Sequence, residues 1–420
     1  MRAPPTTPWY YGWNVIAVGI AFQTIIFGVS FFSYTLWAGQ WRTAFHAARG
    51  DVMLGIMILT VCQGVMAPLA GRAMDRMSIR ALICAGAVIT AGGFVLISQA
   101  TALWQILAIY GTIVALGTLL AGPLAAQTLA AKWFSRRRGL AIGFSTIGTS
   151  LGGFLLPPVV AWLFLSYGWR EAHLILAGVI VVTVVPMIWL VVRNSPEEAG
   201  VPPEPESHAA ARQPAQAHPD WTTGMLLRQR NFWITIGAFV PMATVFGALQ
   251  HNLAQIASDS GIDAARASWV VVTLSGAMVL GKIGFGAVAD RYDLRLLFTG
   301  AIGLLACSGL IFMTTPAFPL LCLGAAVMGV AQGGFLPLLG CIVGTRFGPH
   351  AFGRVMGLVG LFTPICAAGP WLAGRLRDID GSYDLVIQIF LALLVPALVA
   401  IFFLKPLVSA IEPARLVPGE

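Results

Sequence analysis

Twelve apolar stretches follow one another along almost the whole chain of 420 residues. A helix needs about 20 apolar residues to cross the hydrocarbon core of a bilayer, and each stretch is long enough to do so. Only 10% of the residues are charged, against about 25% in a water-soluble domain. The sequence therefore predicts an all-α integral membrane protein with twelve transmembrane helices. The expected limits are 12–37, 51–72, 80–99, 103–131, 139–166, 171–192, 231–256, 266–289, 294–315, 317–345, 353–376 and 382–404.

Two charged decapeptides repeat one pattern half a chain apart. They are GRAMDRMSIR at 71–80 and GAVADRYDLR at 286–295, and their Gly, Asp and two Arg residues coincide at an offset of 215. Each decapeptide closes the second span of a set of six. Parallel six-span halves with a site between them are a known architecture of secondary transporters. The repeat therefore predicts two pseudo-symmetric six-helix halves.

The segment between the halves has a different composition. Residues 193–220 are rich in Pro, Ala and Glu and poor in large apolar side chains, so they cannot bury enough surface to fold alone. The sequence WTTGMLLRQRNF that follows is a candidate for a short interfacial helix. We expect an N-terminal half at 1–192, a linker at 193–230 and a C-terminal half at 231–420.

The distribution of basic residues orients the spans. If both termini are cytoplasmic, that side holds 18 of the 25 Lys and Arg residues and the opposite side holds six. This asymmetry follows the positive-inside rule and explains the net charge of +8 without a nucleic-acid partner. We expect a multi-pass protein of a bacterial inner membrane, with the lipid bilayer as its surroundings. The oligomeric state is left open.

Several of these sequences resemble a known family. The decapeptides are similar to the loop motif G-x-x-x-D-R-x-G-x-R of the major facilitator superfamily, with Ser78 and Asp293 where the second Gly usually stands. KWFSRRRGLAIGFSTIGTSLGG, followed by PP and YGWREA, resembles the fourth-to-sixth span region of the monocarboxylate-porter and oxalate/formate-antiporter branch. YYGWNVIAVGIAF is similar to the opening of that branch. The resemblance implies the major facilitator fold and a transporter.

The resemblance also implies a role for the decapeptides. They would form a cluster that latches the inner side shut in one state and releases it in the other. A carboxylate at these positions can accept hydrogen bonds from helix N-termini and from nearby arginines. The alternative is a static turn with solvated charges. The candidate latch residues are Gly71, Asp75, Arg76, Arg80, Gly286, Asp290, Arg291 and Arg295.

Lys282 is the one clear charge inside an expected span. It precedes Asp290 by eight residues, about 12 Å along a helix, which is too deep for easy snorkelling. An intramembrane charge is a functional candidate because its insertion is costly. In the branch named above, an Arg usually stands here, and the resemblance implies contact with a substrate carboxylate. The alternative is a lysine in a water pocket without a ligand.

The identity of this cation narrows the substrate. A Lys lacks the planar fork that clamps a carboxylate at two points, but a desolvated Lys can release its proton. Met278 replaces the acid that animal members carry one turn earlier. Proton coupling would therefore run through Lys282, His251 or the substrate itself. Oxalate-type carriers of the branch have a second basic residue in span eleven, and GLVGLFTPICAAGPWLAG has none. With one fixed cation, the resemblance therefore favours a monoanion over a dicarboxylate.

Other polar and aromatic residues are weaker candidates for the substrate site. Gln23, Phe27 and Tyr34 share a helical face in span one, which would face either the cavity or a neighbouring helix. Further candidates are Gln250, His251 and Asn252 in span seven, Gln332 and Phe335 in span ten, and Phe362 in span eleven. Close helix packing is the first explanation for Ser145, Thr146 and Thr149, which lie among glycines in span five. Pro123, Pro337 and Pro364 permit bends within their spans.

The function classes can then be weighed. We expect a secondary active transporter of a small organic monoanion, a monocarboxylate, working by alternating access and coupled to protons. The alternatives are a proton-driven efflux carrier for lipophilic compounds and a transport-inactive anion sensor. No HExxH, GxSxG or Walker motif argues for an enzyme. No cofactor or metal site is expected, because the six cysteines lie in apolar runs without zinc-type spacing.

Overall fold

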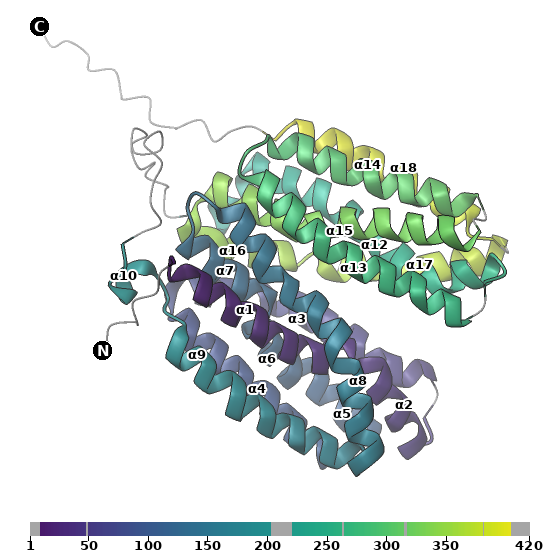
Figure 1. Cartoon of the computed structure of the whole chain (residues 1–420), viewed down its shortest axis with the longest axis horizontal. Helices are drawn as coiled ribbons and strands as arrows, with labels where there is room; N and C mark the ends of the chain where they lie inside the picture. The colour runs from purple at the N-terminus through teal and green to yellow at the C-terminus, as the bar shows by residue number, and fades with distance from the viewer. Residues whose placement is uncertain are drawn as a thin grey trace, which may run out of the picture.

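The computed structural model describes residues 9–47, 49–202, 221–262, 264–314, 317–380 and 382–404. Within these ranges the secondary structure is helical, without strands. Figure 1 shows the helices as two elongated bundles lying side by side, the first coloured purple to teal and the second green to yellow. This arrangement confirms the expected all-α fold with two six-helix halves.

The first bundle contains the six spans that precede the linker. Three short π-helical stretches, labelled η1 to η3, interrupt its α-helices. The elements are α1 (Gly12–Phe27), η1 (Gly28–Phe32), α2 (Tyr34–Ala44), α3 (Arg49–Arg76), α4 (Ile79–Ser98), α5 (Leu103–Ile109), η2 (Tyr110–Val114), α6 (Ala115–Leu120), α7 (Pro123–Trp133), α8 (Arg138–Val179), η3 (Ile180–Val184) and α9 (Val185–Val191).

The linker and the second bundle complete the chain. Two short helices belong to the linker: α10 (Pro196–Ala199) and α11 (Thr223–Arg228). The helix expected in WTTGMLLRQRNF corresponds to α11 and begins after Thr222, whose side chain accepts a hydrogen bond from Met225 N. The second bundle consists of α12 (Arg230–Asp259), α13 (Ala264–Ala289), α14 (Leu294–Met313), α15 (Phe318–Phe347), the 3₁₀ turn η4 (Pro349–Ala351), α16 (Phe352–Gly360), α17 (Thr363–Asp380) and α18 (Asp384–Phe402).

Spans five and six are joined by a tight turn. Among the described residues, eleven helical stretches are long and apolar enough to cross a membrane, and one of them, Arg138–Val191, has 54 residues. A helix of that length would reach about 80 Å, far beyond a hydrocarbon core of about 30 Å. Gly168 breaks it, with φ 82° and ψ 161°, at the boundary expected from the sequence. The eleven stretches therefore make twelve spans.

Two of the three expected proline bends are breaks in the helix. Span four is interrupted at Ala121 and Gly122, immediately before Pro123. Span eleven is interrupted between Gly360 and Thr363, immediately before Pro364. Pro337, by contrast, lies inside the continuous helix α15. A proline removes one backbone hydrogen bond but does not by itself end a membrane helix.

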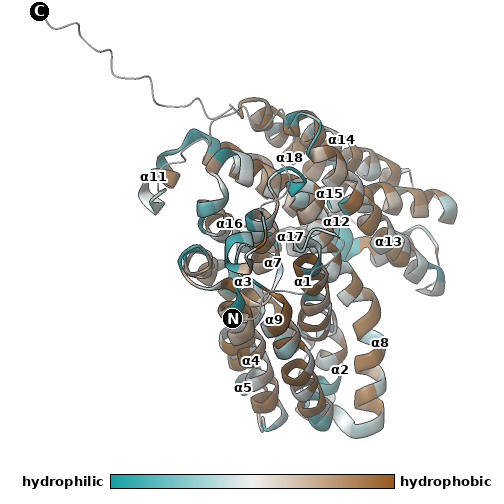
Figure 2. Ribbon diagram, turned by 60° about the vertical axis from the view of Figure 1, so that its left-hand side comes forward, coloured by the Kyte–Doolittle hydropathy of each residue, from teal (hydrophilic) through white to brown (hydrophobic). Residues whose placement is uncertain are grey.

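The outer surface of the bundles has the character of a lipid-facing protein. Large apolar side chains are widely exposed, among them Leu165, Val182 and Leu280, whose exposed fractions are 78%, 73% and 68%. Figure 2 shows the helices brown along their lengths, with hydrophilic teal segments gathered towards helix ends. An exposed apolar surface this extensive suits lipid and not water.

The two bundles meet at one end of the molecule. We call the end that carries α10 and the ends of α3 and α13 the linker side, and the opposite end the far side. In Figure 1 the bundles converge on the linker side, at the left, and diverge towards the far side. Glycines allow the close approach: a Cβ on Gly139 would lie 2.8 Å from the Gly286 carbonyl oxygen, and the reverse distance is also 2.8 Å.

Candidate functional site

Lys282 lies between the two bundles. Its side chain projects from α13, and the residue is only 3% exposed. The ammonium group donates three hydrogen bonds to α8 of the other half: to Thr146 O at 2.7 Å, Thr149 Oγ1 at 2.8 Å and Ser150 Oγ at 2.7 Å. A lysine has three donors, so this arrangement uses all of them.

The acceptors around Lys282 are neutral. The ion pairs recorded among the described residues, Arg80–Glu198 and Arg295–Asp293, do not include it. The ammonium is thus a buried cation held by one carbonyl and two hydroxyls. Buried charges in proteins are normally paired with an opposite charge. Among the described residues, no carboxylate forms an ion pair with Lys282.

Glycines hold α13 tightly at this level. A Cβ on Gly143 of α8 would lie 2.5 Å from Lys282 O, and one on Gly333 of α15 would lie 2.6 Å from Lys282 N. The backbone around Lys282 is therefore clamped between α8 and α15. Small residues permit such close packing between membrane helices.

Asp75 closes the linker side on one flank. It lies at the end of α3, and its two carboxylate oxygens accept hydrogen bonds from Gly353 N at 2.9 Å and Arg354 N at 2.8 Å. These are the first backbone N–H groups of α16 in the other half. A carboxylate at a helix N-terminus satisfies unpaired N–H groups and complements the helix dipole.

Asp290 makes the symmetric contact on the other flank. It follows α13 and accepts hydrogen bonds from Gly139 N at 2.7 Å and Leu140 N at 3.1 Å, at the start of α8. Arg138 beside it donates to Gly344 O of α15 at 2.9 Å. Each half thus caps a helix of the other, and the linker side is closed in this structure.

The remaining motif residues do not share one role. Gly71 lies where a Cβ would collide with Gly353 O, whereas Arg76 and Arg291 are exposed. Arg80 lies 4.0 Å from Glu198 and stacks over Trp189. Gly286 packs on α8 as described above.

The departures from the family motif have a structural reason. Ser78 is the N-cap of α4 and accepts a hydrogen bond from Ala81 N. Asp293 is the N-cap of α14, accepts a hydrogen bond from Arg295 N and lies 3.7 Å from the Arg295 guanidinium. Both residue types are favoured at N-caps.

The span-one candidates have different neighbours. Gln23 donates to Ser145 O at 2.6 Å, and its buried Oε1 has no hydrogen-bond partner among the described residues. Phe27 stacks on Phe31. Tyr34 donates to Val52 O at 2.6 Å and packs edge-on against Tyr110. Gln23 and Phe27 lie one turn apart on α1, whereas the π-helix η1 between Phe27 and Tyr34 changes the helical register before Tyr34.

The span-seven candidates lie towards the far side of α12. Asn252 donates to Ala248 O and Pro370 O and accepts from Tyr383 OH, which ties α12 to α17 and α18. His251 is exposed, with Nδ1 2.8 Å from Gly247 O. Gln250 is half-buried.

The last three candidates lie in the second half. Gln332 of α15 has a buried Oε1 without a partner. Phe335 stacks on Phe239 of α12 at a ring distance of 3.9 Å. Phe362, in the break of span eleven, lies edge-on to Trp233. These contacts do not join the three to Lys282.

Sequence reasoning missed Ser150 and explained Thr149 by packing alone. Both carry hydroxyls that bind Lys282. The sequence signal was a pair of hydroxyl residues in an apolar span, but their partner depends on how α8 and α13 are rotated against each other.

Twelve spans in two parallel halves with a polar site between them define a secondary-transporter architecture. A model of the Major Facilitator Superfamily matches residues 18–254 and 252–416. The chain belongs to this superfamily, and it is a membrane transporter, as its relatives are, and not an enzyme.

Several relatives of known name are membrane transporters. Monocarboxylate transporter 12 of Mus musculus is 26% identical over 406 residues, covering 91% of this chain and 82% of that protein. Monocarboxylate transporter 2 of Homo sapiens is 25% identical over 402 residues, covering 91% and 83%. The MFS-type transporter YcxA of Bacillus subtilis is 21% identical over 407 residues, covering 93% of each.

Solved structures share the fold. The human organic anion transporter MFSD10 superposes with a TM-score of 0.68 at 16% identity, covering 95% of this chain and 100% of that one. The fucose:proton symporter FucP of E. coli gives a TM-score of 0.68 at 13% identity, covering 94% and 100%. At these identities the likeness concerns the fold alone.

Proposed function

We propose that this chain carries a small organic monoanion, a monocarboxylate, across the membrane by alternating access and together with a proton. The observation that carries the proposal is Lys282, a buried ammonium group between the halves whose recorded partners are all neutral oxygens. The names of the monocarboxylate transporters among the relatives support the same substrate class.

In the proposed mechanism, the substrate carboxylate competes with α8 for Lys282. With the site empty, the ammonium bonds to Thr146 O, Thr149 and Ser150 and joins α13 to α8. A carboxylate is a stronger acceptor for an ammonium than a neutral oxygen. Substrate binding then removes a bond between the halves, which weakens the closure of the linker side.

Asp75 and Asp290 would act as the latch of this closure. Their hydrogen bonds cross from one half to the other at the ends of α3 and α13. When the halves rock apart on the linker side, these contacts break and the N-termini of α16 and α8 separate from their carboxylates. The structure would then correspond to the state that opens towards the far side.

The charge count favours a monoanion. Lys282 supplies one positive charge when it is protonated, and the stretch of span eleven from 355 to 372 contains no Lys or Arg. A second carboxylate of a dianion would lack a counter-charge there. The proton would cross together with the anion, carried by Lys282, by His251 or by the substrate itself.

We assign the linker side to the cytoplasm of a bacterial inner membrane. In the topology expected from the sequence, that side carries 18 of the 25 basic residues, including Arg136, Arg137 and Arg138 in one loop, in line with the positive-inside rule. Both termini would then be cytoplasmic.

Uptake into proteoliposomes tests the proposal. Labelled acetate, lactate, pyruvate and benzoate are offered to wild type and to Lys282→Gln, with and without an inward proton gradient. We expect gradient-driven accumulation of at least one acid by wild type. A hydrogen bond to a charged group is worth about 1.5–3 kcal/mol, so uptake below saturation should fall roughly 10- to 100-fold in Lys282→Gln.

Two further variants and two outcomes complete the test. Lys282→Arg keeps the charge and should retain more uptake than Lys282→Gln, and Arg42→Gln removes an exposed far-side cation and should match wild type. If uptake by Lys282→Gln equalled that of wild type, Lys282 would not be the residue that binds the anion. Export of lipophilic compounds without acid uptake would favour an efflux carrier, and acid binding without transport would favour a sensor.

A further inference from the structure

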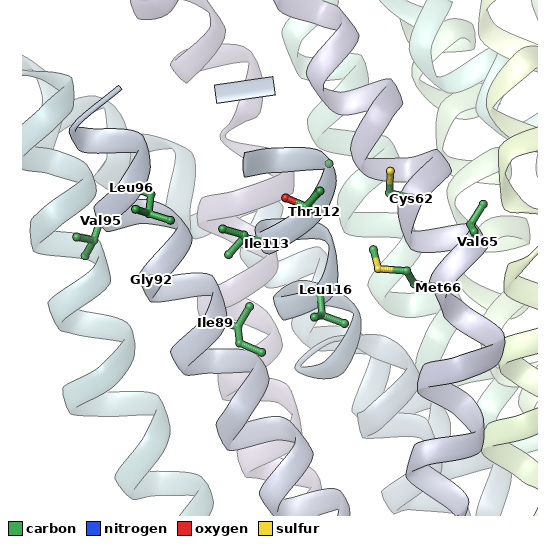
Figure 3. Close-up of a pocket in the computed structure, with 11 residues that line it drawn as sticks. Cys62, Val65, Met66, Ile89, Gly92, Val95, Leu96, Thr112, Ile113 and Leu116 are labelled. Atoms are coloured by element: carbon green, nitrogen blue, oxygen red, sulfur yellow. The ribbon is translucent and has the colours of Figure 1, made fainter. Parts of the chain in front are cut away.

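A hollow opens on the lipid-facing side of the first half, between α3 and α4. Its cavity volume is about 930 Å³, within the range of ligand-binding pockets. Figure 3 shows the side chains of α3 on one side, those of α4 on the other, and Thr112, Ile113 and Leu116 of span four between them. The hollow is lined by Cys62, Val65, Met66, Ile89, Gly92, Val95, Leu96, Gly111, Thr112, Ile113 and Leu116.

Missing side chains and an irregular helix create this hollow. Gly92 on α4 has no other atom within 4 Å of where a Cβ would stand. Gly111 and Thr112 belong to the π-helix η2, which widens span four at this level. The floor of the hollow therefore lies below the surface formed by the neighbouring side chains.

The hollow offers no polar group to a ligand at its centre. Thr112 is the lining residue with a hydroxyl, and that hydroxyl donates to Ala108 O at 2.7 Å. The other lining side chains are apolar or, for Cys62, only weakly polar. Because the hollow lies within the membrane-spanning helices, a hydrocarbon chain is the ligand that matches it.

The hollow becomes polar towards the far side. A second cavity of about 330 Å³ shares Leu96 with the first and is also lined by Gln99, Trp104 and Gln105. Trp104 is 68% exposed, as is usual for tryptophans at the membrane–water interface. Gln99 is exposed too, and its amide can bond to an ester or a phosphate.

A cation lies at the same end. The guanidinium of Arg170 donates to Ala100 O at 2.9 Å, and Ala100 lines the second cavity. Arg170 is exposed, so it can also approach a phosphate. Towards the far side, the surface thus presents the apolar groove, then the amides of Gln99 and Gln105 with the indole of Trp104, and then the positive charge of Arg170.

We propose that this groove binds one phospholipid of the far-side leaflet. An acyl chain lies between α3 and α4 over η2, and the glycerol and phosphate lie at Gln99, Trp104 and Arg170. The surface is first apolar, then amide-bearing and then cationic, and this order matches the acyl chain, glycerol and phosphate of a phospholipid. Since α3 also ends in the latch residue Asp75, the bound chain contacts a helix that takes part in closure.

Photo-crosslinking tests the proposal. The purified protein is placed in nanodiscs that contain a phosphatidylglycerol with a diazirine near the middle of one acyl chain, irradiated and digested. We expect adducts concentrated on the groove residues Cys62, Met66 and Ile113. Gly92→Phe places a ring in the groove from a position where a Cβ meets no atom within 4 Å, and it should lower these adducts at least fivefold.

A matched variant controls for the added ring. Gly303 of α14 is exposed and likewise has no atom within 4 Å of a Cβ position, so Gly303→Phe should leave the groove adducts unchanged. Thermal unfolding in detergent verifies that both variants fold. Adducts spread evenly over the lipid-facing helices of wild type, or unchanged in Gly92→Phe, would overturn the proposal.

A second arm tests the head group. Native mass spectrometry should detect one retained phospholipid per chain, and Gln99→Leu with Arg170→Gln should reduce that retention at least threefold. A diazirine-labelled alkane without a head group should label the groove more weakly than the phospholipid. Equal labelling by the alkane, or full retention in the double variant, would mean that any free lipophile fits and would contradict the phospholipid assignment.

Discussion

Lys282 concentrates the chemistry of this protein in one side chain. Its ammonium uses three donors on three oxygens of α8, so in the empty state it satisfies its hydrogen bonds but not its charge. In the proposed function Lys282 binds the anion, and in this structure its hydrogen bonds join the two halves. The side chains of Thr149 and Ser150 set the strength of that bond.

Removing the two hydroxyls should make anion binding tighter. In Thr149→Val with Ser150→Ala, the ammonium keeps only the Thr146 carbonyl, so a carboxylate has less to displace. The loss of about 1.4 kcal/mol of competing interaction corresponds to a tenfold lower Kd. Isothermal titration with the transported monocarboxylate measures this change. Weaker binding would mean that the hydroxyls hold Lys282 in its binding position and do not compete.

Removing the two latch charges should open the linker side. Asp75→Asn and Asp290→Asn weaken two carboxylate contacts with helix N-termini, each worth about 1 kcal/mol, so the double variant should shift the closed–open equilibrium about tenfold or more. Cys341 reports on it, because this thiol is 3% exposed and lies on α15 three residues before Gly344, whose carbonyl accepts a hydrogen bond from Arg138 beside Asp290.

The labelling rate of Cys341 by a membrane-impermeant maleimide is the measurement. The five other cysteines are replaced by alanine, and the reagent is offered on the linker side. Unchanged labelling in the double variant would make the two contacts static turns and not a latch.

The candidate site could be predicted in part from the sequence. Lys282 stands out because a charge in an apolar span is costly, and Asp75 and Asp290 stand out because their decapeptides repeat. Their geometry is consistent with the expected roles, which stay predictions. The different neighbours of Gln23, Phe27 and Tyr34 could not be foreseen, because a π-helix leaves no clear signature in residue spacing.

At the scale of helices, glycine contacts determine how closely the halves approach. A Cβ on Gly143 would lie 2.5 Å from Lys282 O, so Gly143→Ala must push α8 and α13 apart. We expect faster labelling of Cys341 from the linker side and reduced uptake. Gly178→Ala, in span six and with open space around it, should behave as wild type. Equal effects of the two substitutions would show that helix propensity, and not contact, is responsible.

The turn between spans five and six depends on one glycine. Gly168 has a positive φ of 82° with an extended ψ of 161°, a region that residues with a Cβ rarely occupy. Gly168→Ala should destabilise the fold by about 1–3 kcal/mol and lower the Tm in detergent. Gly178→Ala again serves as the control, and an unchanged Tm for Gly168→Ala would mean that the turn readily adopts another conformation.

Most helices could be predicted from their apolar length, because each must cross the same thickness of hydrocarbon. The expected limits of spans three and nine, 80–99 and 294–315, differ from α4 and α14 by at most two residues at each end. The first span was expected to end at residue 37, whereas α2 continues to Ala44, because the polar residues there stay helical beyond the apolar run. The helix breaks before Pro123 and Pro364 depend on local packing. Pro337 is also a proline, but the helix around it is continuous.

At the scale of the whole molecule, the pseudo-symmetry is kept at the latch and broken at the cation. Asp75 and Asp290 make equivalent contacts, but the position equivalent to Lys282 is Ala67, 215 residues earlier. Ala67 packs against Gly360, because a Cβ built on Gly360 would lie 2.8 Å from the Ala67 Cβ. Lys282 lies against Thr146 at the corresponding place on the other flank. At this pair of positions, the second half therefore supplies a charge through Lys282, and the first half supplies only tight packing through Ala67.

This asymmetry leads to the central claim, that an anion bound at Lys282 controls the closure of the linker side. In the closed structure, the Lys282 contact with α8 and the Asp290 contact with the start of α8 lie on the same two helices, about 12 Å apart along α13. Loss of the first contact should therefore weaken the second.

The most direct test is the labelling rate of Cys341 from the linker side as the transported monocarboxylate is titrated. The account predicts that labelling of wild type rises with the acid, is half-maximal at its Kd and then saturates, and that labelling of Lys282→Gln does not respond at any concentration. The same response in Lys282→Gln, or no response in wild type under conditions where it transports the acid, would contradict the claim.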